Sequence, residues 1–442
     1  MKKRAIGLVT VGVTAALVLS GCGAANNAPA ATGGTTTINV AYWPGPELTA
    51  MQAVVKKYNA GQGKTDHVSV NLTTFSTADM FNKELVDMST KSSTLDMYYT
   101  ASYLLGQHAP YLVPLTGVDT KALLASAVKG FSADGKFYAV PMDASFVGTI
   151  YRTDLMKTLL GDPAARQTFE TISQKVVGKK LDPKPPAEWT WDDYLATGAY
   201  FTKKYNPNSP TEYGTILPAM NSAFSGMQWA GVLYSMGGSF TTKDGKQNFG
   251  TPQAKQAVEL YATAIKDGIA SPNSSQGNAT SLNAALTSGS VAFEMQWHSS
   301  LAGFNDASAA PVTAGKVAIV AIPGGHKGHM HLQGLGINKY SKHIDAAKKF
   351  VNYLLTPAAL DTYGNNGGIP PAPSYLNSTP ALKPIGVLMR DDTESEPSIG
   401  KVDAYTVSTL IGNTLSNAWL GNEDPAAALT ALQAALKKQA AG

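Results

Sequence analysis

Three histidines lie close together in the sequence Gly-Gly-His-Lys-Gly-His-Met-His: His326, His329 and His331. Imidazole nitrogens are good ligands for zinc, copper or nickel, so this spacing could hold a metal ion. However, the segment is rich in glycine and has no neighbouring carboxylate or thiolate, which leaves the histidines without groups to orient them. We therefore favour a solvated loop over a metal site, and we expect no metal or other cofactor.

The sequence lacks the short motifs of common catalytic sites. It contains no Gly-x-Ser-x-Gly, no His-Glu-x-x-His, no phosphate-binding loop and no dinucleotide fingerprint. Glu294, within an alternating strand pattern, is the one carboxylate that we consider as a catalytic group. The paired carboxylates of a glycoside hydrolase leave no local sequence pattern, so that class stays open as an alternative. We expect a binding protein rather than an enzyme.

Cys22 is the only cysteine, so the chain cannot form an internal disulfide bond. The segment before it begins with three cationic residues and continues as an uncharged apolar run from Ala5 to Leu19. This layout is typical of a secretory signal peptide, and the run is shorter than the about 20 residues that a membrane-spanning helix needs. We predict a signal peptide over residues 1–21.

Leu19-Ser20-Gly21-Cys22 resembles the lipobox of bacterial lipoproteins. The resemblance implies cleavage before Cys22 and acylation of this cysteine, and two or more acyl chains give durable membrane attachment. Residues 23–36 contain no large apolar side chain and many turn formers, so we predict a flexible lipidated linker over 22–36. The expected location is the outer face of the cell membrane.

Charge and length exclude some classes of protein. The net charge of +4 includes three cations of the signal peptide, and beyond that segment basic residues occur at most in pairs. Nucleic acid is therefore not an expected partner, because it requires clustered Lys and Arg. The chain beyond the signal peptide is too long for one hydrophobic core, so we expect two or more lobes.

The hydrophobic pattern alternates between strands and helices. Near the start it predicts strands at 37–43, 68–72 and 95–99, with helices between them, which is the βαβ pattern of a parallel sheet. Asp134-Gly135 predicts a hairpin turn. Thr190 and Asp193 predict a capping box at the start of a helix, and Thr251-Pro252 predicts the start of another helix. Further predicted strands and helices cover 137–140, 146–151, 291–297, 317–321, 344–355 and 426–438.

Five segments together resemble the extracellular solute-binding proteins of bacterial ABC import systems, in particular the large sugar-binding group. The segments are Asp134–Pro141, Ile150–Leu155, Trp189–Tyr194, Leu286–Phe293 and Leu335–Val351. They occur in the order that the family has them and span nearly the whole chain after the signal peptide. The polar stretch 161–187 and the histidine-rich segment depart from the pattern, and we interpret 161–187 as an insertion.

The resemblance implies an α/β, two-lobed fold like that of periplasmic binding proteins. Each lobe is expected to be a mostly parallel sheet flanked by helices, with the ligand cleft between the lobes. Lobe 1 would consist of residues 37–147 and 333–383, and lobe 2 of residues 148–332 and 384–442.

The candidate ligand-binding residues follow strands or lie at the expected crossings between lobes. A pyranose presents C–H faces that pack on aromatic rings, and hydroxyl groups that need hydrogen-bond partners. Sugar-binding relatives often have a stacking Trp where this chain has Trp297, so the resemblance makes it the leading candidate. Trp43 and Tyr99, at the ends of predicted strands, could serve the site or the core. The remaining candidates are Asp143, Trp229, His298, Gln333 and Tyr405.

These features predict a lipid-anchored, monomeric protein that captures a mono- or oligosaccharide by lobe closure. The family resemblance implies delivery to the membrane-embedded permease subunits of an ABC transporter. A receptor for a peptide or a metal is the nearest alternative, and a tethered glycoside hydrolase is a more distant one. An anionic solute would require Arg at the cleft, but only Arg152, Arg166 and Arg390 follow the signal peptide, so an uncharged carbohydrate agrees best.

Overall fold

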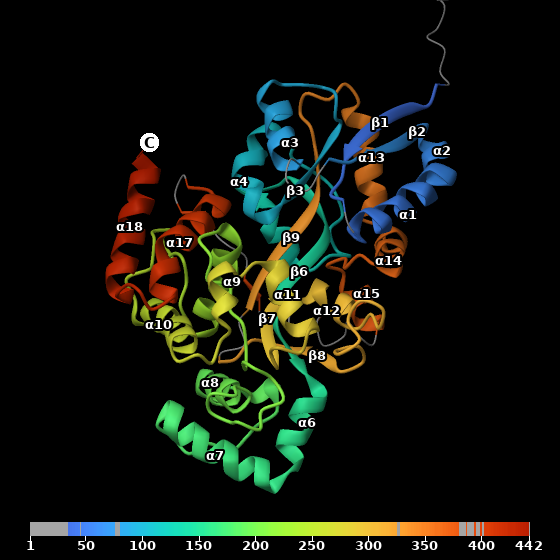
Figure 1. Cartoon of the computed structure of the whole chain (residues 1–442). Coiled ribbons are helices and arrows are strands. Elements are labelled where there is room, and N and C mark those ends of the chain that lie inside the picture. The colour runs from blue at the N-terminus through green and yellow to red at the C-terminus, as the bar shows by residue number, and fades with distance from the viewer. Residues whose placement is uncertain are drawn as a thin grey trace, which may run out of the picture. The chain divides into compact units, whose positions relative to one another are not determined.

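Figure 1 shows the computed structural model of the chain. It describes residues 34–441 except Gly45 and residues 76–79, 325–327, 380–385, 387–392, 395–397 and 400–401. Residues 35–442 form one compact unit. The predicted signal peptide, the lipid attachment at Cys22, most of the linker and His326 lie outside the described residues.

The main sheet has the strand order β2-β1-β3-β9-β6-β7, with β8 paired to β6 and β10 paired to β9. Strand β1 pairs in parallel with β2 and β3, and β10 in parallel with β9, whereas β3, β6, β7, β8 and β9 pair antiparallel with one another. The pairing is therefore mixed rather than mostly parallel. The bounds are β1 Thr36–Ala41, β2 Val68–Thr73, β3 Met97–Ala101, β6 Ala139–Arg152, β7 Phe293–Trp297, β8 Val317–Val320, β9 Gly328–Ile337 and β10 Thr393–Glu394.

Strand β6 is 14 residues long and changes partners along its length. Its first part, from Ala139 to Phe146, pairs with β9, and its second part pairs with β7 and β8. A bulge between Pro141 and Asp143 interrupts the register. Two separate strands were expected here because the bulge breaks the apolar pattern, but the backbone continues through it. In Figure 1, β6 and β9 run side by side between the β1–β3 part of the sheet and the β7–β8 part.

Two large hydrophobic cores lie along this sheet. The first contains β1–β3 with α1 (Pro46–Ala60), α3 (Met80–Ser89), α13 (Ile344–Leu354) and α14 (Pro357–Asn365). The second contains β7 with α6 (Thr153–Gly161), α7 (Pro163–Val177), α8 (Trp191–Tyr200), α9 (Ala223–Ser235), α10 (Pro252–Lys266), α17 (Ala404–Trp419) and α18 (Pro425–Ala441). The division of the chain into two lobes, with its boundaries, stays a prediction.

Short helices complete the structure around smaller clusters. Leu282 and Leu286 of α11 and Phe304 of α12 pack with Ile150 of β6. Ala127 of α5 belongs to a cluster under β9. The bounds are α2 Gln62–Asp66, α4 Leu105–His108, α5 Ala125–Gly130, α11 Ala279–Thr287, α12 Leu301–Phe304 and α15 Pro373–Ser378.

Several local predictions are confirmed. Asp134 and Gly135 connect β4 (Ser132–Ala133) to β5 (Lys136–Phe137) and both have positive φ, 49° and 72°, as a tight hairpin turn requires. Thr190 and Asp193 form the capping box of α8. Thr251 caps α10 by accepting a hydrogen bond from the backbone N–H of Ala254.

The polar stretch 161–187 contains the whole of α7, whose Phe169 and Ile172 join the second core. Among the described residues, no helix has the length and the apolar character needed to cross a bilayer.

Candidate functional site

Three aromatic rings lie against one another beyond the end of β1. Trp43 follows β1, Phe81 lies in the first turn of α3, and Tyr99 lies in the middle of β3. The Trp43 ring stacks on Phe81 at 5.2 Å and on Tyr99 at 6.0 Å between ring centroids. Tyr99 is buried, whereas Trp43 and Phe81 are partly exposed. We call these three residues the β1 aromatic stack.

Asp143 lies at the bulge of β6, within electrostatic range of Tyr99. Its Oδ2 accepts a hydrogen bond of 2.8 Å from the backbone N–H of Ile369 and one of 3.3 Å from the Tyr363 hydroxyl. Burial, together with the negative charge of Glu47, raises the pKa of Asp143 to about 8. A protonated carboxyl group both donates and accepts hydrogen bonds, so at neutral pH this side chain can serve either kind of partner.

A second group of rings surrounds His331 on β9. Trp297 ends β7, and its ring centroid lies 4.1 Å from that of His331 and 5.4 Å from that of His329. Tyr103 lies edge-on to His331 at 5.4 Å, and Tyr405 lies 5.9 Å from Tyr103. We call these five residues the β9 ring cluster.

The stack and the cluster meet at one contact. Phe81 lies edge-on to Tyr103 with 6.5 Å between ring centroids. A continuous series of rings therefore runs from Trp43, after the first strand, to Tyr405, in the first turn of α17. Flat apolar faces beside polar atoms can bind a solute that is apolar on its faces and polar at its rim.

His298 directly follows Trp297 and is buried. Its ring stacks on Phe146 of β6, and its Nδ1 accepts a hydrogen bond of 3.1 Å from the Phe146 backbone N–H. This bond requires a neutral ring that is protonated on Nε2. Burial lowers the pKa of His298 to about 4, so the ring is neutral at neutral pH.

Several polar atoms in this region have no hydrogen-bond partner among the described residues. The Gln333 amide nitrogen donates to His331 Nε2 at 3.2 Å, which leaves Gln333 Oε1 and His331 Nδ1 unpartnered. The Tyr99 hydroxyl and His298 Nε2 are unpartnered as well. A buried polar group without a partner is unfavourable, so these atoms are suited to donate to or accept from a bound solute.

The structure brings together seven of the eight predicted site residues. Trp43, Tyr99 and Asp143 lie at the β1 aromatic stack, and Trp297, His298, Gln333 and Tyr405 lie in or beside the β9 ring cluster. Trp229 lies apart from them. It is completely buried in the second core, between Phe249 and Trp419.

The histidine-rich segment is not a solvated loop in its described part. His329 and His331 belong to β9, and His329 is completely buried. The sequence predicted a loop because the segment is rich in glycine. The alternation of apolar and polar residues that would indicate a strand is not evident there, because histidines occupy several of its positions. Among the described residues, no group of three or more His, Cys, Asp or Glu is arranged to hold a metal ion.

Glu294, the carboxylate considered for catalysis, is completely buried on β7. Neither of its oxygens has a hydrogen-bond partner among the described residues. Burial raises the pKa of Glu294 well above its usual value, so the group is a neutral acid without access to solvent.

The described arginines lie outside the ring series and have carboxylate partners. Arg152 contacts Asp154 at 2.6 Å, and Arg166 contacts Asp182 at 3.5 Å. Arg390 lies outside the described residues. The ring series therefore offers no described arginine to an anionic solute.

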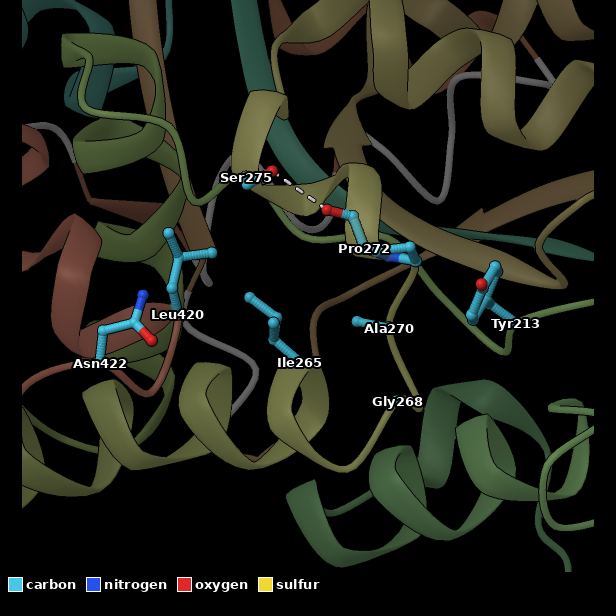
Figure 2. Close-up of a pocket in the computed structure, with 8 residues that line it drawn as sticks. All are labelled: Tyr213, Ile265, Gly268, Ala270, Pro272, Ser275, Leu420 and Asn422. Atoms are coloured by element: carbon cyan, nitrogen blue, oxygen red, sulfur yellow. Dashed lines mark hydrogen bonds between the residues drawn. The ribbon is translucent and has the colours of Figure 1, made fainter.

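Figure 2 shows a pocket of about 440 Å³ that contains none of the predicted site residues. It lies between the end of α10, the residues after α17 and the segment 268–275, and its walls are largely apolar. The residues that line it are Tyr213, Ile265, Gly268, Ala270, Pro272, Ser275, Leu420 and Asn422. Tyr213 is the one aromatic ring among them, so a stacking platform of the kind described above is absent from this wall.

The sequence missed four residues of the ring series and its surroundings: Glu47, Phe81, Tyr103 and His331. Phe81 lies in an apolar helical pattern, which does not distinguish a site residue from a core residue, and Tyr103 follows Tyr99 without a strand pattern of its own. Glu47 follows the break Pro44-Gly45-Pro46, which was the available signal. The contact of Tyr103 with His331 joins residues that are far apart in the sequence, which no local pattern reveals.

Comparisons with known proteins agree with this architecture. A "Probable ABC transporter-binding protein" of Deinococcus radiodurans is 25% identical over 276 residues, which are 60% of this chain and 59% of that protein. The "Lactose-binding protein" of Rhizobium radiobacter is 23% identical over 291 residues, 63% of this chain and 59% of that protein. The matched regions thus span less than two thirds of these relatives.

A solved structure confirms the predicted α/β fold of periplasmic binding proteins. The cyclic α-maltosyl-1,6-maltose binding protein from Arthrobacter globiformis superposes with a TM-score of 0.72 at 21% identity, over 92% of this chain and 100% of that one. The sequence profile described as "Bacterial extracellular solute-binding protein" matches residues 53–384, which is most of the chain. The chain therefore belongs to the bacterial extracellular solute-binding proteins.

Proposed function

We propose that this protein captures a carbohydrate, a mono- or oligosaccharide, and delivers it to an ABC transporter. The observation that carries the proposal is the continuous series of rings from Trp43 to Tyr405. Sugars pack their C–H faces on such rings, and their hydroxyl groups match the unpartnered atoms of Tyr99, His298 and Gln333. The names of two similar proteins, which bind lactose and a cyclic maltosyl-maltose, support the same class of solute.

Capture would work by closure of the two predicted lobes around the solute. The β1 aromatic stack lies on elements of the first core, and Trp297 lies in the second core. A solute that touches both groups favours the arrangement in which they are close, because it makes additional contacts there. Strands β6 and β9, which pair along Ala139–Phe146, would carry the hinge.

The remaining parts of the proposal concern location and partners. Acylated Cys22 would hold a monomer at the outer face of the cell membrane, and residues 22–36 would let it reach the permease subunits. A flexible linker of this composition spans tens of ångströms on average. Radiolabelled palmitate incorporation that is lost in Cys22→Ala would test the anchor.

Thermal shift and titration calorimetry with a panel of mono- and oligosaccharides test the solute class. A ligand at a hundred times its Kd adds about 2.7 kcal/mol of stability and raises Tm by a few degrees. The variant Tyr405→Ala should lower the affinity for the sugar by roughly threefold to tenfold, the range for one aromatic contact. Tyr405 is 43% exposed, so its removal leaves the core intact.

Tyr213→Ala is the matched control, because it removes a tyrosine from the pocket of Figure 2. Unchanged affinity in this variant is expected. If Tyr213→Ala lowers the affinity for the sugar and Tyr405→Ala does not, the sugar binds in the pocket of Figure 2 and not at the ring series. Binding of peptides or metals without any sugar would replace the carbohydrate proposal, and release of cleaved sugar would establish the hydrolase alternative.

A further inference from the structure

Gln296 of β7 has a completely buried side-chain amide whose hydrogen-bonding groups are all engaged. Its Oε1 accepts a hydrogen bond of 3.2 Å from Gln228 Nε2 of α9 and one of 2.9 Å from the backbone N–H of Trp297. Its Nε2 donates to Asn283 Oδ1 of α11 at 2.9 Å and to the Ala279 carbonyl oxygen at 3.4 Å. A primary amide has two acceptor sites and two donors, so Gln296 uses its full capacity.

One of these bonds holds the backbone of the leading candidate for stacking. Trp297 is the last residue of β7, and the pairing of β7 with β6 ends at the pair of Trp297 with Val147. The chain then turns into a short 3-10 helix, His298–Ser300. A buried backbone N–H needs a partner, and at this strand end the Gln296 side chain provides it.

Gln296 acts from the face of the sheet opposite to the Trp297 ring. Successive side chains of a strand point to opposite faces. The Trp297 ring lies against His331 and His329 of β9, whereas the Gln296 amide reaches Asn283 of α11. Because Gln296 is completely buried, a solute that stacks on the ring does not touch the amide. Gln296 can therefore influence such a solute only through Trp297.

The bonds of the amide favour a single position of the Trp297 backbone. Rotation of the Gln296 side chain would break its bonds to Gln228 and Asn283 and leave buried polar atoms without partners, which is unfavourable. Fully satisfied buried networks of this kind are rigid. A binding surface that is fixed before the solute arrives loses less conformational freedom on binding. The network therefore holds the indole ring ready for the solute.

We propose that Gln296 is a positioning residue of the sugar site, whose amide fixes the backbone of Trp297 and thereby holds the indole ring for stacking. This inference rests on the proposed carbohydrate function and on Trp297 as a stacking ring. It adds a residue that no solute contacts, and it connects the ring to the helices α9 and α11.

A double-mutant cycle tests the inference, with titration calorimetry at pH 7 and with lactose and maltose as the first sugars of the panel. Gln296→Met keeps the length of the side chain and removes all four bonds. It should lower the sugar affinity by roughly threefold to tenfold, the range for one aromatic contact, and by no more than Trp297→Leu does. In the Trp297→Leu background, Gln296→Met should change the affinity by less than about twofold, because the ring through which it acts is absent.

Gln296→Glu provides a rescue that a loss of packing would not show. At pH 5 a buried carboxyl group is neutral, because burial raises its pKa. It then has an acceptor for the Trp297 N–H and an O–H donor for Asn283. At this pH, Gln296→Glu should bind the sugar within about twofold of the native protein, whereas Gln296→Met should stay weaker. Equal weakness of the two variants would contradict the inference.

Gln247→Met is the matched control, because the Gln247 amide donates to the Gln433 carbonyl oxygen at 3.2 Å and has no bond to Trp297. Its sugar affinity should stay unchanged. Circular dichroism verifies folding, and Asn283→Ala, at a partly exposed position, takes the place of Gln296→Met in the cycle if that variant does not fold.

Two results of the cycle would overturn the inference and leave the carbohydrate function intact. They are an unchanged affinity in Gln296→Met, and a loss of equal size with and without the Trp297 ring. If the native protein binds no sugar of the panel, both the inference and the proposed function are wrong.

Discussion

The β1 aromatic stack and the β9 ring cluster both place rings beside buried titratable groups, but the groups are of opposite kind. The stack lies within electrostatic range of Asp143, whose carboxyl group accepts a hydrogen bond from the Tyr363 hydroxyl. The cluster has imidazoles, and His298 beside it is held by the Phe146 N–H. Burial neutralises both groups, since it raises the pKa of Asp143 and lowers that of His298.

The comparison shows that one physical cause gives two opposite pH responses. Asp143 has a folded pKa of about 8, above that of an unfolded carboxyl group, so its contribution to stability is complete at low pH and is lost as pH rises through 8. His298 has a folded pKa of about 4, below that of an unfolded imidazole, so its contribution is complete at high pH and is lost as pH falls through 4.

The largest effect is expected for Asp143→Asn. Between pH 4 and pH 8 the native protein should lose stability relative to this variant, by on the order of 5 kcal/mol for a shift of this size. Urea unfolding of both proteins across this range measures the difference. Parallel pH profiles would mean that Asp143 is ionised in the folded protein and that the two regions do not differ as described.

A second test compares the tryptophan of each region. Trp297→Ala should destabilise the protein by about 3 to 5 kcal/mol, the range for a buried aromatic side chain, because Trp297 is 8% exposed and packs in the second core. Trp43→Ala should cost less, because Trp43 is partly exposed. Urea midpoints at pH 7 give the order, and the reverse order would show that the stack, not the cluster, is the structural centre.

This contrast also explains what the sequence could predict. Caps, turns and the alternation of strands and helices follow from neighbouring residues, so Thr190, Asp134-Gly135 and the α/β class were correct. Trp297 was predicted from the family resemblance and Asp143 from its place after a strand pattern, and their role in binding stays a prediction. Other features depend on which distant segments of the chain come together in the fold, which no local pattern reveals. They are the contact of Tyr103 with His331, the burial of Trp229 and the mixed pairing of the strands.

The third test concerns the acidic side of the profile. His298→Asn places an amide oxygen near the position of Nδ1, so it keeps an acceptor for the Phe146 N–H but cannot take up a proton. The native protein should lose on the order of 3 kcal/mol relative to this variant as pH falls from about 6.5 to 4. Chemical unfolding at several pH values measures it, and an equal loss in both proteins would assign acid sensitivity to other groups.

The smallest effect on stability is expected at Gln333, which bonds to His331 of the cluster. Gln333→Met preserves the length of the side chain and removes both the amide donor to His331 and the unpartnered Oε1. The lost hydrogen bond is offset by removal of a polar atom without a partner, so stability should change by less than about 1 kcal/mol. Sugar affinity should nevertheless fall by roughly tenfold, because a solute hydroxyl loses its acceptor. If stability falls strongly while affinity persists, Gln333 positions the β9 ring cluster and does not contact the solute.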